Sequence, residues 1–121
     1  MLSTMNQGYR IISLEGEINY ANSRHISKEL LSFITEEQNH YILDVSRLEN
    51  IDSTGLGVLF SFSKKCHIQS KESKLVAGNT SWYKLLHFSK LDRVLSIYPD
   101  VSTAILTCKT KPDTGFSILE Y

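Results

Sequence analysis

The sequence contains little cysteine, little proline and no long apolar run, and each shortage excludes a class of protein. Its 121 residues include two cysteines and no CxxC spacing, so neither a disulfide framework nor a cysteine-based metal site is indicated. We interpret Cys66 and Cys108 as reduced residues of the core. No apolar run approaches the roughly 20 residues of a membrane-spanning helix, and the N-terminus lacks the charged and apolar regions of a signal peptide. These absences predict a cytoplasmic protein with no membrane partner.

An excess of charge of either sign is also missing. The 13 basic and 13 acidic residues balance, and the lysines and arginines are dispersed along the chain. This pattern argues against a nucleic-acid partner, which requires a basic patch or stripe. The apolar fraction of 41% and the length fit one globular domain with its own core. We expect that domain to occupy residues 1–108, followed by a C-terminal tail over 109–121 that forms an edge strand or stays loosely held.

The motifs of common enzymes are absent as well. The chain has no GxxxxGK phosphate loop and no GxGxxG turn, and Ser53 is not framed as GxSxG. Four histidines share no metal-like spacing and are predicted to lie at surfaces or helix ends: His25, His40, His67 and His87. We therefore predict no enzymatic activity, no metal and no cofactor.

Apolar and polar segments alternate along the chain with the spacing of strands and helices. Strands are predicted at residues 9–14, 41–45, 75–77 and 95–98, with a further one at 2–5. Helices are predicted from Asn22 or Ser23 to near Asn39, from Leu56 to about His67, around Trp82 to Phe88, and from Pro99 to Cys108. Residues 69–74 are predicted to form a loop. The order predicts an α/β fold with one small mixed, mainly parallel sheet and about four helices.

The stretch from Asp52 to Gly57, Asp-Ser-Thr-Gly-Leu-Gly, follows the apolar strand at 41–45 and opens a helix. Ser53 and Thr54 are thereby placed at or near a helix N-terminus, where unpaired N–H groups and the helix dipole favour an anion. A hydroxyl in this place suits either a helix cap or a phosphorylation site. In parallel sheets, functional groups gather at the carboxyl ends of strands, so we expect the loop at residues 19–23 to lie beside Ser53.

Two features of this helix allow more than one interpretation. Gly55 and Gly57 indicate close packing against the sheet, clearance for another protein to reach Ser53, or both together. Val58 and Phe62 lie four residues apart, on a face other than the apolar stripe predicted to bury one side of the helix. That pair is either half buried under a neighbouring element or part of a docking surface. The predicted stripe comprises Leu56, Leu59, Phe60, Ser63 and Cys66.

Three segments together resemble the STAS domain, and more narrowly the bacterial anti-sigma factor antagonists. They are Gly16-Glu17-Ile18, the strand Tyr41-Ile42-Leu43-Asp44-Val45, and the run from Ile51 to Leu59 that contains Asp-Ser-Thr-Gly-Leu-Gly. The resemblance covers roughly residues 8–108, and the last of these segments is its most specific part. Asn19 stands where the family often has Asp, and Ser89-Lys90 replaces a frequent Gly.

The resemblance implies a protein that switches partners without being a catalyst. In this family the unphosphorylated antagonist binds an anti-sigma factor that is also a serine kinase, which releases the sigma factor. The kinase phosphorylates the hydroxyl of the motif and the complex dissociates, and a PP2C-type phosphatase reverses the mark. The resemblance implies Ser53 as the acceptor, with Thr54 as the second choice. The implied partner-binding residues are Asn19, Tyr20, Asp52, Ser53, Thr54, Gly55, Leu56, Gly57, Val58 and Phe62. The alternative is a STAS regulatory subunit of a sensory or transporter complex.

Overall fold

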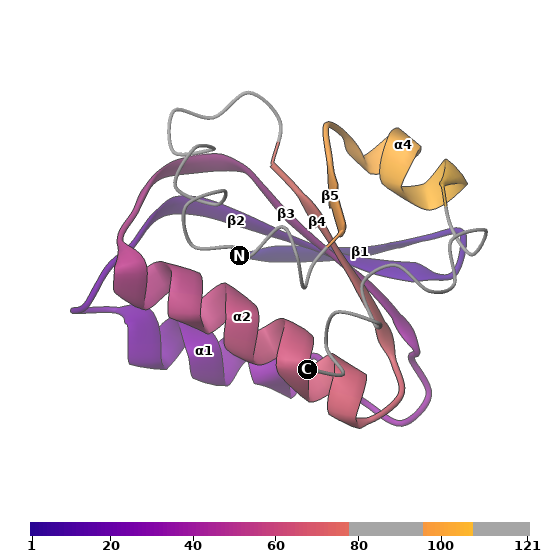
Figure 1. Cartoon of the computed structure of the whole chain (residues 1–121), viewed down its shortest axis with the longest axis horizontal. Helices are drawn as coiled ribbons and strands as arrows, with labels where there is room; N and C mark the ends of the chain where they lie inside the picture. The colour runs from indigo at the N-terminus through magenta and orange to yellow at the C-terminus, as the bar shows by residue number, and fades with distance from the viewer. Residues whose placement is uncertain (78–95, 108–121) are drawn as a thin grey trace.

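Five strands form one mixed sheet in a computed structural model that describes residues 1–77 and 96–107 (Figure 1). The strands follow one another across the sheet in chain order: β1 Leu2–Asn6, β2 Tyr9–Ile18, β3 His40–Ile51, β4 Glu72–Val76 and β5 Ser96–Tyr98. β1 pairs antiparallel with β2, and the other pairs are parallel. The prediction of a small, mainly parallel α/β sheet is confirmed.

Helices cover both faces of the sheet, but unequally. Figure 1 shows α1 (Ser23–Ser32) and α2 (Ser53–Ile68) lying side by side against one face, while the short α4 (Val101–Leu106) covers one end of the other. The helix predicted around Trp82 lies outside the described residues, as do Cys108 and the tail 109–121. The described ranges contain no helix that is both long and apolar enough to cross a membrane.

The apolar run of β3 is buried from both sides. Tyr41, Leu43 and Val45 face the larger core beneath α1 and α2, whereas Ile42 faces α4 in a smaller cluster that includes Ile105. This double burial explains a continuous apolar strand, because each face of a covered sheet needs its own apolar residues. Cys66 is buried in the larger core, and burial raises the pKa of its thiol to about 12, so it is a core residue as predicted.

Two strands are longer than the sequence predicts. β2 does not stop at residues 15–17 but continues to Ile18, and β3 extends from Val45 to Ile51, where the two strands end as register partners. The pairing is irregular around Gly16, whose φ of +81° is in the left-handed region that favours glycine. The extensions contain polar residues that belong to the strands through backbone pairing between β2 and β3. The spacing of apolar residues gives no sign of such pairing, so the sequence did not predict these lengths.

Helix α1 ends earlier than predicted, at Ser32 instead of near Asn39. In the segment that was predicted to be helical, backbone groups are bound by the buried ammonium of Lys71. It donates to the carbonyl oxygens of Thr35 and Gln38, at 2.9 and 3.0 Å, and to Oδ1 of Asn39, at 3.2 Å. Charged groups are buried only when such partners are present. The chain between α1 and β3 is thus fastened by a lysine distant in sequence.

The predicted loop at residues 69–74 is partly wrong, because β4 begins at Glu72. Lys74 lies within this strand with its side chain 4% exposed. Its ammonium donates to the carbonyl oxygen of Ala104 at 2.6 Å and lies 3.6 Å from the Glu72 carboxylate. The polar sequence of this strand therefore reflects a buried, paired cation.

Candidate functional site

The N-terminus of α2 begins where β3 ends, and Asp52 caps it. The Asp52 backbone is extended, with φ −107° and ψ −173°, and its Oδ1 accepts the N–H of Gly55 at 3.0 Å. Ser53 and Thr54, predicted to lie at or near a helix N-terminus, are the first two residues of α2, which begins earlier than the predicted Leu56. The capping role belongs to the neighbouring carboxylate, so neither hydroxyl is needed to cap the helix.

Asp52 also joins α2 to the loop between β2 and α1. Its N–H donates to the carbonyl oxygen of Ile18 at 3.3 Å. The N–H of Gly55, then the hydroxyl of Thr54 and the N–H of Tyr20, lower the pKa of the Asp52 carboxyl below its ordinary value, because each donates to the charged form. The prediction that the 19–23 loop and the start of α2 are neighbours is confirmed.

The two hydroxyls differ in their surroundings. Ser53 is exposed, and its hydroxyl has no hydrogen-bond partner within residues 1–77 and 96–107. Thr54 is partly buried, and its hydroxyl lies near the Asp52 carboxylate, whose pKa it helps to lower. Of the two, only Ser53 presents a hydroxyl that is both exposed and uncommitted to another described residue.

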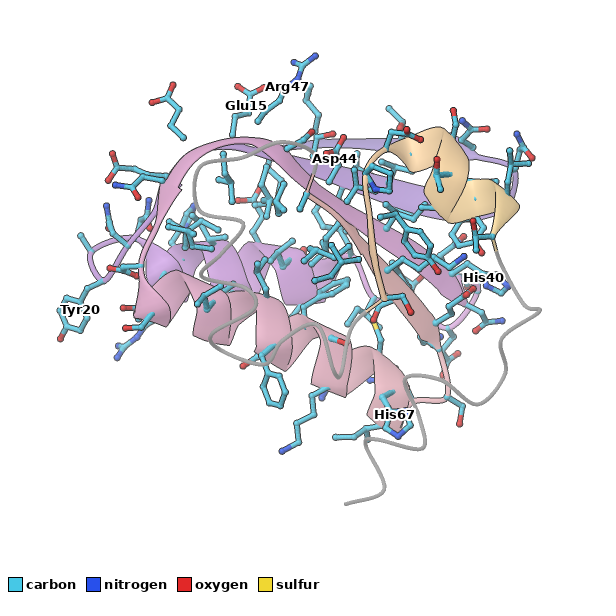
Figure 2. The ribbon with its side chains drawn as sticks, turned by 45° about the horizontal axis from the view of Figure 1, so that its top comes forward. Glu15, Tyr20, His40, Asp44, Arg47 and His67 are labelled. Atoms are coloured by element: carbon cyan, nitrogen blue, oxygen red, sulfur yellow. The ribbon has the colours of Figure 1, made fainter. Side chains whose placement is uncertain are left out.

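The loop before α1 holds an exposed aromatic residue on an ordered backbone. Oδ1 of Asn19 accepts the N–H groups of Ala21 and Asn22, at 2.9 and 3.1 Å. Oδ1 of Asn22 accepts the N–H of Asn19 at 2.9 Å, and Nδ2 of Asn19 donates to Glu17 at 2.9 Å. These bonds commit the Asn19 side chain to the loop. Tyr20 is 83% exposed, and Figure 2 shows it projecting from this end of the domain.

The two glycines of the motif have opposite environments. A Cβ atom on Gly55 would lie 2.4 Å from Cγ1 of Ile51 and 3.0 Å from both Cβ and the carbonyl oxygen of Ile18. A Cβ atom on Gly57 would meet nothing within 4 Å. Close packing therefore explains Gly55, and open space surrounds Gly57.

The remaining apolar residues of the implied partner surface belong largely to the core. Leu56 and Val58 are each 6% exposed, and Phe62 is 1% exposed with its ring edge-on to Tyr41. The docking-surface interpretation of Phe62 is therefore wrong. The predicted apolar stripe is wrong at Phe60, which is 38% exposed. A helix covered by both a sheet and a second helix buries more than one stripe, so spacing alone did not identify the exposed aromatic residue.

A groove of about 630 Å³ runs between α1 and α2 and reaches the start of α2. Sequence reasoning missed its α1 side, although the spacing of Arg24 and Lys28 on one predicted helix was a signal. The described residues that line it are Ser23, Arg24, Ser27, Lys28 and Leu31 of α1, and Thr54, Gly57, Val58 and Ser61 of α2.

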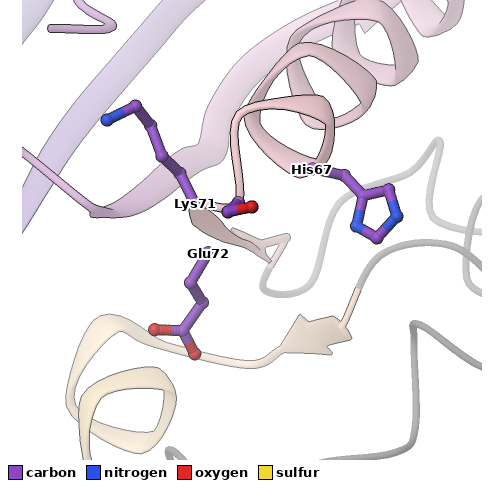
Figure 3. Close-up of a pocket in the computed structure, with 4 residues that line it drawn as sticks. His67, Lys71 and Glu72 are labelled. Carbon is purple, nitrogen blue, oxygen red and sulfur yellow. The ribbon is translucent and has the colours of Figure 1, made fainter. Parts of the chain in front are cut away.

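A second pocket, of about 260 Å³, lies near the other end of α2 (Figure 3). His67, Ser70, Lys71 and Glu72 line it. Figure 3 shows the Lys71 side chain pointing away from His67. Its ammonium binds the carbonyl oxygens of Thr35 and Gln38. The described residues contain no cluster of three or more metal-ligating side chains. His25, His40 and His67 are exposed, as predicted, and His87 lies outside the described residues.

The structure is thus a small α/β domain that presents an exposed serine hydroxyl at the start of a helix. The family model of the STAS domain matches residues 3–104. The chain therefore belongs to the STAS domain family.

Among its relatives is the anti-sigma F factor antagonist of Paenibacillus polymyxa, which is 27% identical over 83% of this chain and 86% of that protein. The crystal structure of an anti-sigma factor antagonist from Mycobacterium paratuberculosis has the same fold, with a TM-score of 0.79 at 21% identity over 87% of this chain and 89% of that chain. The Bacillus cell fate determinant SpoIIAA in its phosphorylated form also has this fold, with a TM-score of 0.64 at 19% identity over 89% of this chain and 98% of that chain. Anti-sigma factor antagonists are non-enzymatic proteins.

The chain is also 28% identical, over 74% of its length, to the Arabidopsis thaliana protein named "Probable sulfate transporter 3.4". It spans only 16% of that protein. In that relative the matched region is therefore a small part of a much longer chain.

Proposed function

We propose that this chain is an anti-sigma factor antagonist controlled by phosphorylation of Ser53. Its unphosphorylated form binds an anti-sigma factor that is a serine kinase, which releases the sigma factor, and a PP2C-type phosphatase restores binding after phosphorylation. The observation that carries the proposal is the exposed, uncommitted hydroxyl of Ser53 at the start of α2. The similarity to an anti-sigma F factor antagonist over 86% of that protein's length supports it.

Ser53 is favoured over Thr54 as the acceptor. A kinase must bring the hydroxyl into line with the γ-phosphate of ATP. The Thr54 side chain is partly buried and its hydroxyl lies near the Asp52 carboxylate, so the side chain would have to move before a kinase could reach that hydroxyl. Ser53 requires no such rearrangement.

A phosphate on Ser53 acts on binding more than on folding. It adds a charge of about −1.5 to −2, which the N-terminus of a helix tolerates. The neighbouring Asp52 carboxylate is already ionised and accepts the N–H of Gly55 at the helix start. The phosphate and this carboxylate therefore repel each other in part. At an interface the dianion must lose its water or face like charge. A penalty of about 1.4 kcal/mol weakens binding tenfold, so two or three such steps dissociate a complex.

The surface offered to the partner consists of Tyr20, Ser53 and Gly57, with Thr54 at its edge. Tyrosine side chains are common anchors of interfaces, and Tyr20 lies in a loop ordered by the hydrogen bonds of the Asn19 and Asn22 side chains. Gly55, Leu56 and Phe62 support this surface from beneath because they are buried.

In the test, this chain is incubated with ATP and a purified anti-sigma factor kinase from the same organism. Mass spectrometry then identifies the residue that carries phosphate. We expect one phosphate on Ser53 of the wild-type chain and of Thr54→Ala, and none on Ser53→Ala. Ser53→Asp is expected to melt within a few degrees of the wild type while losing at least tenfold in affinity. Phosphate on Thr54 alone would contradict the choice of acceptor, and equal affinity of Ser53→Asp would contradict the switch.

The second candidate is a STAS regulator within a transporter or sensory complex. The match to a region of a sulfate transporter favours it. Capture of the full chain from native cells, before and after phosphatase treatment, separates the two. A serine kinase recovered only with the dephosphorylated form supports the antagonist, and a transporter subunit recovered with both forms supports the regulator.

A further inference from the structure

We propose that the groove between α1 and α2 binds an acidic helical segment of the partner protein. The inference rests on the proposed function, because Thr54 at the end of the groove is adjacent to Ser53. It adds the chemistry of the partner's segment and identifies the residues of this chain that select it.

The α1 wall of the groove is cationic. Arg24, Lys28 and Leu31 follow at intervals of four and three residues, which places them along one side of the helix. Arg24 and Lys28 are exposed and form no ion pair with any described residue, whereas His25 on the same helix faces Glu29 at 3.8 Å. No acidic residue from the described ranges lines the groove. Both cations are therefore available to carboxylates from another molecule.

The α2 wall is neutral and built of small or buried side chains. Thr54, Val58 and Ser61 are spaced along one side of α2, and Gly57 lies among them with open space where its Cβ would be. A wall without long side chains allows another backbone to approach closely. Leu31 of α1 and the exposed edge of Val58 supply the apolar lining of the groove.

This combination fits the binding of a helix in a groove, with charge selecting the partner. Carboxylates four residues apart on the incoming helix can face Arg24 and Lys28, and an apolar residue one turn further on can contact Leu31. Complementary charge accelerates association and rejects partners of the wrong sign. A phosphate on Ser53 would meet the same carboxylates as like charge, which connects this groove to the switch.

The first test reverses the charge of the groove. The double variant Arg24→Glu and Lys28→Glu is compared with Lys64→Glu and Lys65→Glu, two exposed residues of α2 that do not line the groove and form no ion pair with a described residue. Both change the net charge equally. With a purified anti-sigma factor kinase as the probe, we expect the groove variant to bind at least tenfold more weakly, with less dependence on salt. The control is expected to bind within twofold of the wild type. Equal loss in both variants would overturn the groove and leave only a general charge effect.

The second test fills the groove without touching its charge. Gly57→Leu introduces a side chain into open space, so the fold is expected to persist while affinity falls at least tenfold. Benzoylphenylalanine at Ser61, irradiated in the complex, is expected to cross-link to a partner peptide with two carboxylates at helical spacing. A cross-linked peptide without acidic residues, or one from residues 109–121 of this chain, would overturn the inference.

The outcomes separate this inference from the proposed function. If no anti-sigma factor kinase binds the wild type, the proposed function fails and the groove inference fails with it. If the kinase binds and Ser53→Asp releases it, while the charge-reversed and Gly57→Leu variants bind like the wild type, the groove inference alone fails.

Discussion

The first turns of α2 have an inner face that packs against the sheet and an outer face that borders the groove. Gly55 and Gly57, separated by one residue, show how the two faces differ. Gly55 is pressed against Ile51 and the Ile18 backbone, while Gly57 borders the open groove. Asp52 binds Gly55 and the Ile18 carbonyl, whereas the exposed Ser53 hydroxyl binds no described residue. The inner face fixes the position of the helix start, and the outer face is left available to a partner.

The largest expected effect comes from changing the inner glycine. Gly55→Ala forces a methyl group against Ile51 and the Ile18 carbonyl, and overpacking of this kind costs about 1–3 kcal/mol. We expect the free energy of unfolding, measured with urea, to fall by an amount in that range. Unchanged stability would show that the helix start can move, and the contrast between the faces would be weaker than the distances indicate.

Removing the cap is the next largest change. Asp52→Ala leaves the N–H of Gly55 without its acceptor, so we expect the free energy of unfolding to fall, by less than in Gly55→Ala. Asp52→Asn is the matched control, because asparagine caps helices about as well as aspartate. Urea unfolding of the three proteins should place Asp52→Asn close to the wild type. A large loss in Asp52→Asn would indicate that the negative charge matters more than the hydrogen bond.

Substitution of Gly57, on the outer face, is expected to raise stability, whereas substitution of Gly55 lowers it. Gly57→Ala adds a methyl group in open space and replaces a poor helix former, so the free energy of unfolding should rise by up to about 1 kcal/mol. Partner affinity should stay within a few fold, since alanine is small. A loss of stability would contradict the open environment and remove the contrast with Gly55.

The smallest expected effect is a change of stability with pH at Asp52. Its folded pKa is lowered by the N–H of Gly55 and the other donors, so its stabilising contribution is complete above its unfolded pKa of about 3.9 and disappears as pH falls through the folded value. The stability advantage of the wild type over Asp52→Ala should therefore shrink between neutral pH and about pH 3. An advantage that grew with acidity would reverse the sign of this interaction.

Local patterns were enough to predict the sheet class, the position of Ser53 and Thr54 at or near a helix N-terminus, and the neighbouring 19–23 loop. They were not enough to predict element lengths, because the outer parts of β2 and β3 are held by pairing with each other. They also misplaced Phe60 and Phe62, since the burial of each depends on which elements cover α2.

The sequence by itself determined the order of strands and helices and the place of the motif, since periodicity and capping are local properties of the chain. Only the tertiary structure decided which hydroxyl is exposed, which glycine is packed, and that Arg24 and Lys28 face α2 across a groove. These are relations between residues distant along the chain. They depend on how α1 and α2 pack together and against the sheet, which no single segment encodes.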